Sequence, residues 1–212
     1  MRLTVFGATG GTGRRLVDLA LAAGHEVTAA VREPARLPER APAAPAPHPV
    51  RCDVLDREQV AAAVAGADAV LSALGATDGG PVCGTGVPHI IAAMKAHGVR
   101  RLVALSAAPV PDRDPGDRPL YRLTVRPILR ALFSAAYADL AVMEGEIFTS
   151  GLDWTVLRPP RLTDGPATGA YRTALRRNVP GGYAISRADL AAEMLRVLDD
   201  SAAVRATVGI GY

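Results

Sequence analysis

Three glycines near the start of the chain have the spacing of a phosphate-binding turn. Gly7, Gly10 and Gly13 stand in FGATGGTGRRLV, between an apolar run and a stretch with helical periodicity. Such a turn needs glycine because the backbone must bend sharply and approach a pyrophosphate without a Cβ in the way. The N–H groups at the helix start then face the phosphate, and Thr9 and Thr12 can add hydroxyl donors. The spacing predicts a dinucleotide-binding site.

The residue after the second apolar run bears on which nucleotide is bound. An NAD site usually places Asp or Glu about 20 residues after the turn, on the ribose 2′-OH, whereas an Arg accommodates a 2′-phosphate. This chain has Arg32 there and Arg36 four residues later, so two guanidiniums could share one phosphate. Glu33 is the counter-argument, because it could serve the NAD role. We predict NADP (NADPH) as the cofactor.

The distribution of cations excludes several chemistries. Lys95 is the single lysine in the sequence, and the other basic residues are arginines. A Walker A loop needs Gly-Lys-Ser/Thr, which is absent from the sequence. A catalytic Tyr-x-x-x-Lys pair would need a tyrosine at position 91, where the chain has Ile91. A reductase built on this sequence must therefore use another proton donor.

Three side chains are candidates for that donor. Ser106 ends a predicted central strand, where a hydroxyl can hydrogen-bond a substrate oxygen. Tyr121 and Tyr137 flank a variable loop, although a tyrosine on an apolar helix face is more often part of the core. An acceptor such as a flavin or quinone could also take its proton from water.

Clustered arginines raise the possibility of an anionic substrate. Arg158 and Arg161 are candidates for an anion site. Arg122, Arg126 and Arg130 recur every four residues, which is also typical of a solvated helix face. If they line the mouth of the site, the substrate is anionic.

The elements that must position these residues alternate between strand and helix. Such alternation predicts an α/β fold with a doubly wound parallel sheet covered by helices on both faces. Gly24, Gly66 and Gly98 each follow a helical stretch, where a left-handed cap favours glycine. The predicted strands are 3–7, 26–31, 50–54, 68–74, 101–106, 153–159 and 203–210, and the predicted helices are 12–23, 56–65, 87–97, a stretch ending near Phe148, and 187–198.

Three segments break this rhythm. Residues 38–49 hold five prolines and are predicted as a surface loop. Residues 109–119 form a second Pro/Asp/Arg loop directly after a predicted strand, and ligands of doubly wound sheets lie at the carboxyl ends of strands. Residues 160–186, rich in Gly, Pro and Thr, are predicted as loop.

Length and composition limit the class of protein. The 212 residues favour one domain, 1–212, and the 49% hydrophobic and 21% charged content is globular. The net charge of +3 is spread along the chain, so we expect no nucleic-acid partner. No run is long enough for a membrane span, and the start of the chain has no signal-peptide pattern. Cys52 and Cys83 fit no metal or redox spacing. We expect a cytoplasmic protein, monomer or homodimer, without metal.

The sequence resembles a known family at several segments. GATGGTG, VREPARL, CDV, AAMKAHGV and SGLDWTVLRPPRLTDGPATGAY are similar to the atypical short-chain dehydrogenase/reductases of the NmrA-like type, most closely the biliverdin-IXβ reductase/flavin reductase (NADPH) group. The resemblance implies a single-domain Rossmann fold with strand order 3-2-1-4-5-6 and a further strand, binding NADP in an extended pose.

The resemblance also implies roles for individual residues. The turn residues Gly7, Thr9, Gly10, Gly11, Thr12 and Gly13 would hold the pyrophosphate, Arg32 and Arg36 the 2′-phosphate, and Asp53 and Val54 the adenine. Ala73, Leu74 and Gly75 would lie along the nicotinamide side, with Ser106 at the end of its strand and Pro159 and Pro160 across the pocket.

The chain departs from this group at two positions near the pocket. Arg161 replaces a histidine and Ala107 a serine, which argues against a tetrapyrrole substrate. The implied function is an NADPH-dependent reductase of a small-molecule acceptor such as a flavin, a quinone or a secondary-metabolite carbonyl. The alternatives are an NADP-binding isomerase or dehydratase and a non-catalytic NADP(H)-sensing regulatory protein.

Overall fold

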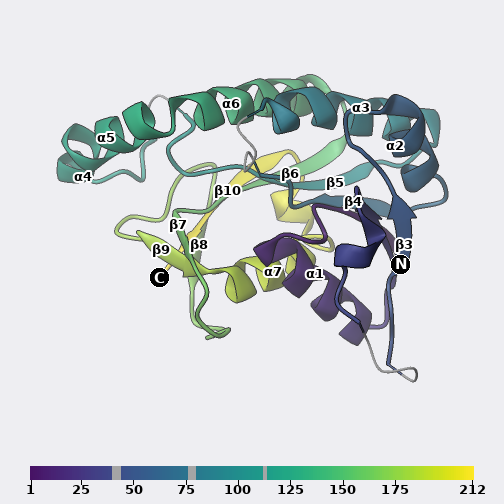
Figure 1. The fold of residues 1–212 in the computed structure, drawn as a ribbon. Helices are drawn as coiled ribbons and strands as arrows, with labels where there is room; N and C mark the ends of the chain where they lie inside the picture. Colours follow the sequence, from purple (N-terminus) through teal and green to yellow (C-terminus); the bar gives the residue numbers. More distant parts are fainter. Residues whose placement is uncertain (40–43, 76–79, 112–113) are drawn as a thin grey trace.

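A mostly parallel sheet with helices on both faces organises the chain (Figure 1). The computed structural model describes residues 1–39, 44–75, 80–111 and 114–212. Within them, eight strands pair in the order β3-β2-β1-β4-β5-β6-β10-β8, and only β8 is antiparallel to its neighbour. This confirms the predicted α/β fold with a doubly wound sheet, and the strand order implied by the resemblance.

The strands are β1 (Arg2–Phe6), β2 (Glu26–Val31), β3 (His48–Arg51), β4 (Ala69–Ser72), β5 (Arg101–Leu105), β6 (Asp153–Arg158), β7 (Arg161–Thr163), β8 (Arg172–Leu175), β9 (Ala184–Ser186) and β10 (Ala206–Gly211). The helices are α1 (Gly11–Ala22), α2 (Arg57–Val64), α3 (Val82–Ala96), α4 (Pro119–Leu123), α5 (Val125–Leu132), α6 (Ser134–Thr149) and α7 (Arg187–Arg196), with short 3₁₀ turns η1 (Pro34–Arg36) and η2 (Ser201–Ala203).

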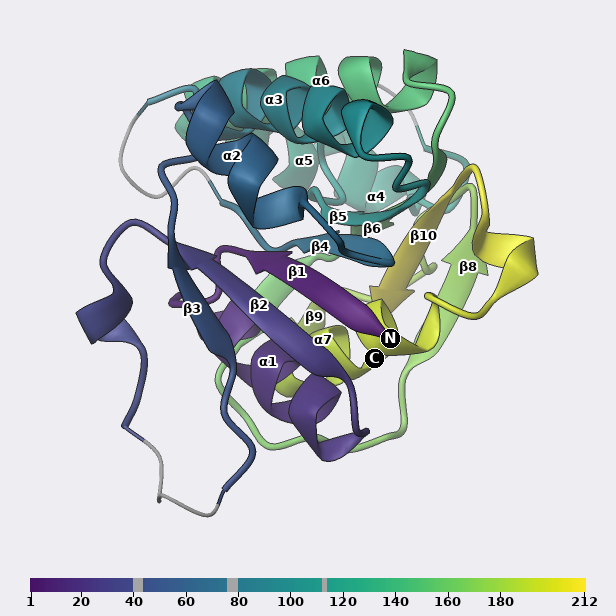
Figure 2. The same cartoon turned by 90° about the vertical axis from the view of Figure 1, so that its right-hand side faces the viewer.

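Two apolar cores lie on the two faces of the sheet. Helices α1 and α7 cover one face, and α2, α3 and α6 cover the other (Figures 1 and 2). Side chains of a strand alternate between faces, so Leu3 and Val5 of β1 lie in the α1–α7 core and Phe6 lies in the opposite core. Because both faces are buried, the central strands are mainly apolar, as the sequence indicated.

Helix α3 starts at Val82 rather than at the predicted Val87, so this boundary was wrong. The segment before Val87 contains Gly84, and glycine ordinarily argues against helix. Here the carboxylate of Asp139 on α6 accepts hydrogen bonds from the N–H groups of Cys83 (2.9 Å) and Gly84 (2.6 Å). A Cβ on Gly84 would stand 2.7 Å from that carboxylate, so glycine allows the close approach. A tertiary contact thus caps α3.

Other boundaries also differ from the predictions. Strand β3 includes Pro49, which was predicted as loop; it is an edge strand, where proline is tolerated. The predicted loop 160–186 contains β7, β8 and β9, of which β8 pairs with β10. Part of each predicted loop 38–49 and 109–119 lies outside the described residues.

In that part of the chain which is described, no helix is long and apolar enough to cross a bilayer.

Buried polar contacts fix the loop after β5 to the segment after β8. The Arg126 guanidinium on α5 pairs with Asp117, and their side chains are 3% and 4% exposed. The amide of Asn178 donates to Asp117 (2.9 Å) and to the Ala108 carbonyl (3.1 Å). The Asp114 carboxylate accepts from the N–H of Asn178 at 2.7 Å. These contacts therefore tie Ala108, Asp114 and Asp117 to the segment after β8.

We expect Asp117→Asn to lower the free energy of unfolding by about 3 kcal/mol, because it leaves a buried guanidinium without its counter-charge. No other group compensates the Arg126 charge, because its Nε and second terminal nitrogen have no hydrogen-bond partner among the described residues. Urea unfolding followed by circular dichroism measures the change. Asp68→Asn is the control: Asp68 pairs with Arg2 on the surface, so the unfolding midpoint should hardly move. Equal effects of the two substitutions on the free energy of unfolding would contradict a special stabilising role of the buried Asp117–Arg126 pair.

Candidate functional site

A cavity of about 410 Å³ opens at the carboxyl ends of the central strands. It lies where the strand order reverses, between β1 and β4, which is where doubly wound sheets bind ligands. Most of the residues predicted to hold the cofactor line it: Gly7, Thr9, Gly10, Gly11, Thr12, Arg32, Asp53, Val54, Ala73, Leu74, Gly75, Ser106 and Pro159. The structure thus brings together residues from β1 to the end of β6.

The positions in the turn require glycine for different structural reasons. Gly7 has a φ of +76°, and a Cβ there would stand 2.6 Å from the Ala73 carbonyl oxygen. A Cβ on Gly13, which is outside the cavity lining, would stand 2.1 Å from the Gly7 carbonyl oxygen. Both positions therefore need glycine for backbone packing.

Gly10 instead borders the cavity and is the N-cap of α1. It has extended backbone angles (φ −75°, ψ 165°), and no side chain caps the helix. The first N–H groups of a helix have no partner within the helix, so an uncapped start leaves them for a ligand. No acidic residue lies in the first turn of α1, which suits an anion such as a pyrophosphate.

Arg32 and Asp53 line the cavity beyond β2 and β3. Arg32 directly follows β2, whereas Arg36 lies in η1, is exposed and is not part of the lining. Asp53 is held by two bonds: its N–H donates to Gln59 Oε1 at 2.9 Å, and its Oδ1 accepts from the Leu55 N–H at 3.0 Å. A fixed carboxylate and a cation at this end suit the adenosine part of a nucleotide.

Ser106 is one of the residues that line the cavity. It follows β5, and its N–H donates to the Leu157 carbonyl at 2.8 Å, which extends the pairing with β6 by one residue. Its Oγ is buried and has no hydrogen-bond partner among the described residues. Since a buried hydroxyl without a partner is costly, it marks a place where a ligand atom would complete the bonding.

The two tyrosine candidates do not line this cavity. Tyr121 on α4 contacts the ring of Tyr183 at a centroid distance of 5.3 Å, and Tyr137 on α6 contacts Phe133 at 6.0 Å. Burial raises the pKa of both phenols. Their proposed role as proton donors stays a prediction, and Pro160 likewise lies outside the lining.

The arginine predictions need correction. Arg158 binds the buried Glu144 carboxylate through Nε (2.8 Å) and a terminal nitrogen (2.6 Å), so it does not offer a free guanidinium to an anion. Arg161 on β7 is exposed, and its role as a substrate contact stays a prediction. The stripe of Arg122, Arg126 and Arg130 is divided by Thr124 between α4 and α5, and its middle member is buried rather than solvated.

Sequence reasoning missed Arg187, the first residue of α7, which also lines the cavity. Its distance from the turn in the sequence left no signal for this position. The described residues contain no cluster of three or more His, Cys, Asp or Glu side chains that could hold a metal ion.

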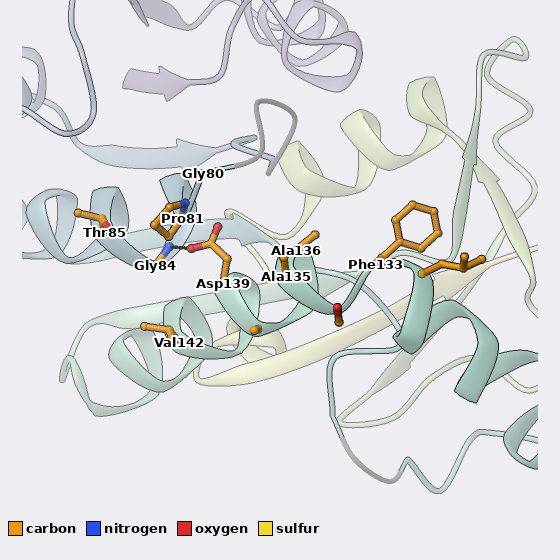
Figure 3. A pocket seen from close by; sticks show the side chains of 12 residues that line it. Gly80, Pro81, Gly84, Thr85, Phe133, Ala135, Ala136, Asp139 and Val142 are labelled. Carbon is orange, nitrogen blue, oxygen red and sulfur yellow. Dashed lines mark hydrogen bonds between the residues drawn. The ribbon is translucent and has the colours of Figure 1, made fainter.

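A second cavity, of about 570 Å³, lies between the start of α3 and the first turns of α6 (Figure 3). Its lining is mainly apolar and includes Pro81, Phe133 and Val142. Asp139 reaches across it to the Gly84 N–H, so its carboxylate serves the cap of α3 (Figure 3). Burial and this carboxylate raise the pKa of Cys83 to about 12, which keeps the thiol protonated.

Comparison with known proteins identifies the family of this chain. The sequence model of an NAD(P)H-binding family matches residues 7–201, which include the turn, Arg32, Ser106 and Arg187. The chain belongs to this NAD(P)H-binding family. Family membership agrees with the uncapped α1 start and the glycine turn, and it confirms the recognised resemblance to NAD(P)H-binding proteins.

One curated relative of this NAD(P)H-binding protein is named as a reductase. A 3-diazoavenalumate denitrifying reductase from a Streptomyces species is 37% identical over 201 residues, covering 83% of this chain and 62% of the relative. An uncharacterised chloroplastic protein of Arabidopsis thaliana is 30% identical over 79% of this chain and 61% of its own length. The chain thus spans about three fifths of these curated relatives.

Solved structures share the fold. A short-chain dehydrogenase/reductase from Veillonella parvula in complex with NADP superposes with a TM-score of 0.84 at 17% identity, covering 100% of this chain and 94% of the other. ChuY, an anaerobillin reductase from Escherichia coli O157:H7, gives a TM-score of 0.78 at 25% identity, covering 99% and 97%.

Proposed function

We propose that this protein is an NADPH-dependent reductase of a small-molecule acceptor. The observation that carries the proposal is Ser106, a residue that lines the nucleotide cavity and whose buried Oγ has no hydrogen-bond partner among the described residues. A protein that only senses the nucleotide has no need of such a hydroxyl, whereas a reductase needs a group that bonds the acceptor atom gaining charge. The reductase names among the relatives support the same class.

The residues of the chain divide the work between binding and proton handling. When bound, the nicotinamide supplies a hydride. The free N–H groups at the start of α1 and the Thr9 and Thr12 hydroxyls hold the pyrophosphate. Ser106 donates a hydrogen bond to the acceptor oxygen, and Ala73, Leu74 and Gly75 form the adjoining wall that excludes water.

The preference for NADPH rests on Arg32. Arg32 lines the cavity directly after β2, where a 2′-phosphate is recognised in this kind of fold. Charge-assisted hydrogen bonds contribute about 1.5 to 3 kcal/mol each, so NADPH should bind at least about tenfold more tightly than NADH.

Arg32→Ala should remove most of that difference. The affinity for NADPH should fall by about tenfold while the affinity for NADH stays nearly the same, because only NADPH carries the 2′-phosphate. Fluorescence titration of both nucleotides measures this. Arg36→Ala is the matched control, and its effect should be smaller because Arg36 lies outside the lining. Equal affinities of the unaltered protein for NADPH and NADH would contradict the proposed preference for NADPH.

The acceptor class is tested by NADPH consumption across flavins, quinones and ketones. A diazo compound belongs in the same panel, because the similar Streptomyces reductase is named for one. Arg161 on the exposed β7 favours an anionic acceptor, and anionic and neutral members of each class should be compared. Absence of NADPH consumption with every class, despite tight nucleotide binding, would favour the sensing alternative.

A further inference from the structure

Among the residues that the structure describes, two cationic ones line the nucleotide cavity: Arg32 and Arg187. Arg32 follows β2, but Arg187 lies against the phosphate-binding turn. A Cβ built on Gly11 would stand 2.8 Å from Cδ and 3.0 Å from Nε of Arg187. Glycine at position 11 therefore lets the arginine side chain lie directly on the first turn of α1.

The ion pair that holds Arg187 in this structure is an exposed one. Its Nη1 lies 2.9 Å from Asp164 Oδ2, and the two side chains are 28% and 74% exposed. Arg15 on α1 also reaches Asp164, at 3.6 Å. Exposed pairs of this kind are weak, because water and salt compete with the attraction. A phosphate that is partly removed from water forms a stronger, charge-assisted bond to the same guanidinium.

The backbone and the arginine offer complementary groups to one anion. The uncapped start of α1 presents N–H donors and a partial positive charge, and Arg187 adds a full charge next to Gly11. Arg187 also begins α7, whose N-cap Ser186 accepts from the Asp189 N–H at 3.0 Å, so a regular helix fixes where the side chain starts. Gly10, Gly11 and Arg187 all line the cavity at the carboxyl ends of the central strands.

We propose that Arg187 binds the pyrophosphate of NAD(P)H, and that Asp164 is the partner of its guanidinium only until the nucleotide arrives. On binding, the phosphate replaces the exposed carboxylate as the partner of Arg187. The proposal concerns the nucleotide alone and holds for whichever acceptor is reduced.

Titration of NADPH and NADH with the full chain tests this proposal. Arg187→Ala should weaken both nucleotides by about tenfold, because both contain the pyrophosphate. Arg187→Lys should recover part of the loss, since it keeps the charge but loses the planar fork. Arg32→Ala is the matched comparison, because it should affect NADPH alone. A loss confined to NADPH in Arg187→Ala would overturn the assignment to the pyrophosphate.

Asp164→Asn separates a binding role from a merely structural one. It breaks the Arg187–Asp164 pair but leaves the guanidinium, so both nucleotides should bind as tightly as before or more tightly. If Asp164→Asn weakens binding as much as Arg187→Ala does, the Arg187–Asp164 pair only maintains the local structure and the proposal is wrong. Circular dichroism checks each fold, and Arg187→Gln replaces Arg187→Ala if the latter does not fold. Binding by the unaltered protein without NADPH oxidation would count against the proposed reductase and leave this inference standing.

Discussion

Replacing Gly10 by valine should abolish nicotinamide nucleotide binding while the fold survives. Gly10 has extended backbone angles that valine adopts readily, and a Cβ there would meet the Gly7 carbonyl oxygen at 3.2 Å, which is tight but close to tolerable. The two methyl groups would then occupy the space in front of the uncapped α1 start, where the pyrophosphate must lie. We expect no binding at concentrations that saturate the unaltered protein.

Two other glycines provide comparisons for this experiment. Gly145→Val places the same change on the exposed surface of α6, where a Cβ would meet nothing within 4 Å, so binding should be unchanged. Gly13→Ala should damage the fold itself, because its Cβ would stand 2.1 Å from the Gly7 carbonyl oxygen. Retained affinity in a folded Gly10→Val protein would mean that the nucleotide binds elsewhere.

Ser106→Ala should lower turnover by about 10²-fold with NADPH affinity almost unchanged. A hydrogen bond to an acceptor oxygen strengthens as hydride arrives and charge develops, so its loss acts on the transition state more than on the bound state; one such contact is typically worth about 10²-fold. Steady-state kinetics with the best acceptor of the panel, together with nucleotide titration, separates the two effects. Ser201→Ala, in the exposed turn η2, is the control with an unaltered rate.

If turnover in Ser106→Ala falls by less than about threefold, which is well below the effect of one lost acid, the proton comes from water or from another side chain. Tyr121→Phe and Tyr137→Phe then decide between these. Loss of activity in either variant would identify a tyrosine that reaches the acceptor, even though neither lines the cavity here. Full activity in both would leave solvent as the source and favour flavin-like acceptors.

The sequence by itself determined the features that depend on neighbouring residues. The glycine turn, the alternating apolar strands and the amphipathic helices follow from local sterics and periodicity. The predicted caps Gly24, Gly66 and Gly98 have φ values of +79°, +76° and +71°, as a left-handed residue after a helix requires. The resemblance to known reductases added the strand order, which periodicity alone leaves open.

Only the tertiary structure decided which distant side chains meet. Asp139 caps α3 across a helix pair, and the helix therefore begins before the predicted Val87. Glu144 takes up the Arg158 guanidinium, which the sequence left as a candidate for an anion. Arg187 reaches Gly11 from the far end of the chain. Charge and hydrogen-bonding capacity are properties of a residue, but whether they are satisfied by the protein or left for a ligand depends on packing between elements that the sequence does not place side by side.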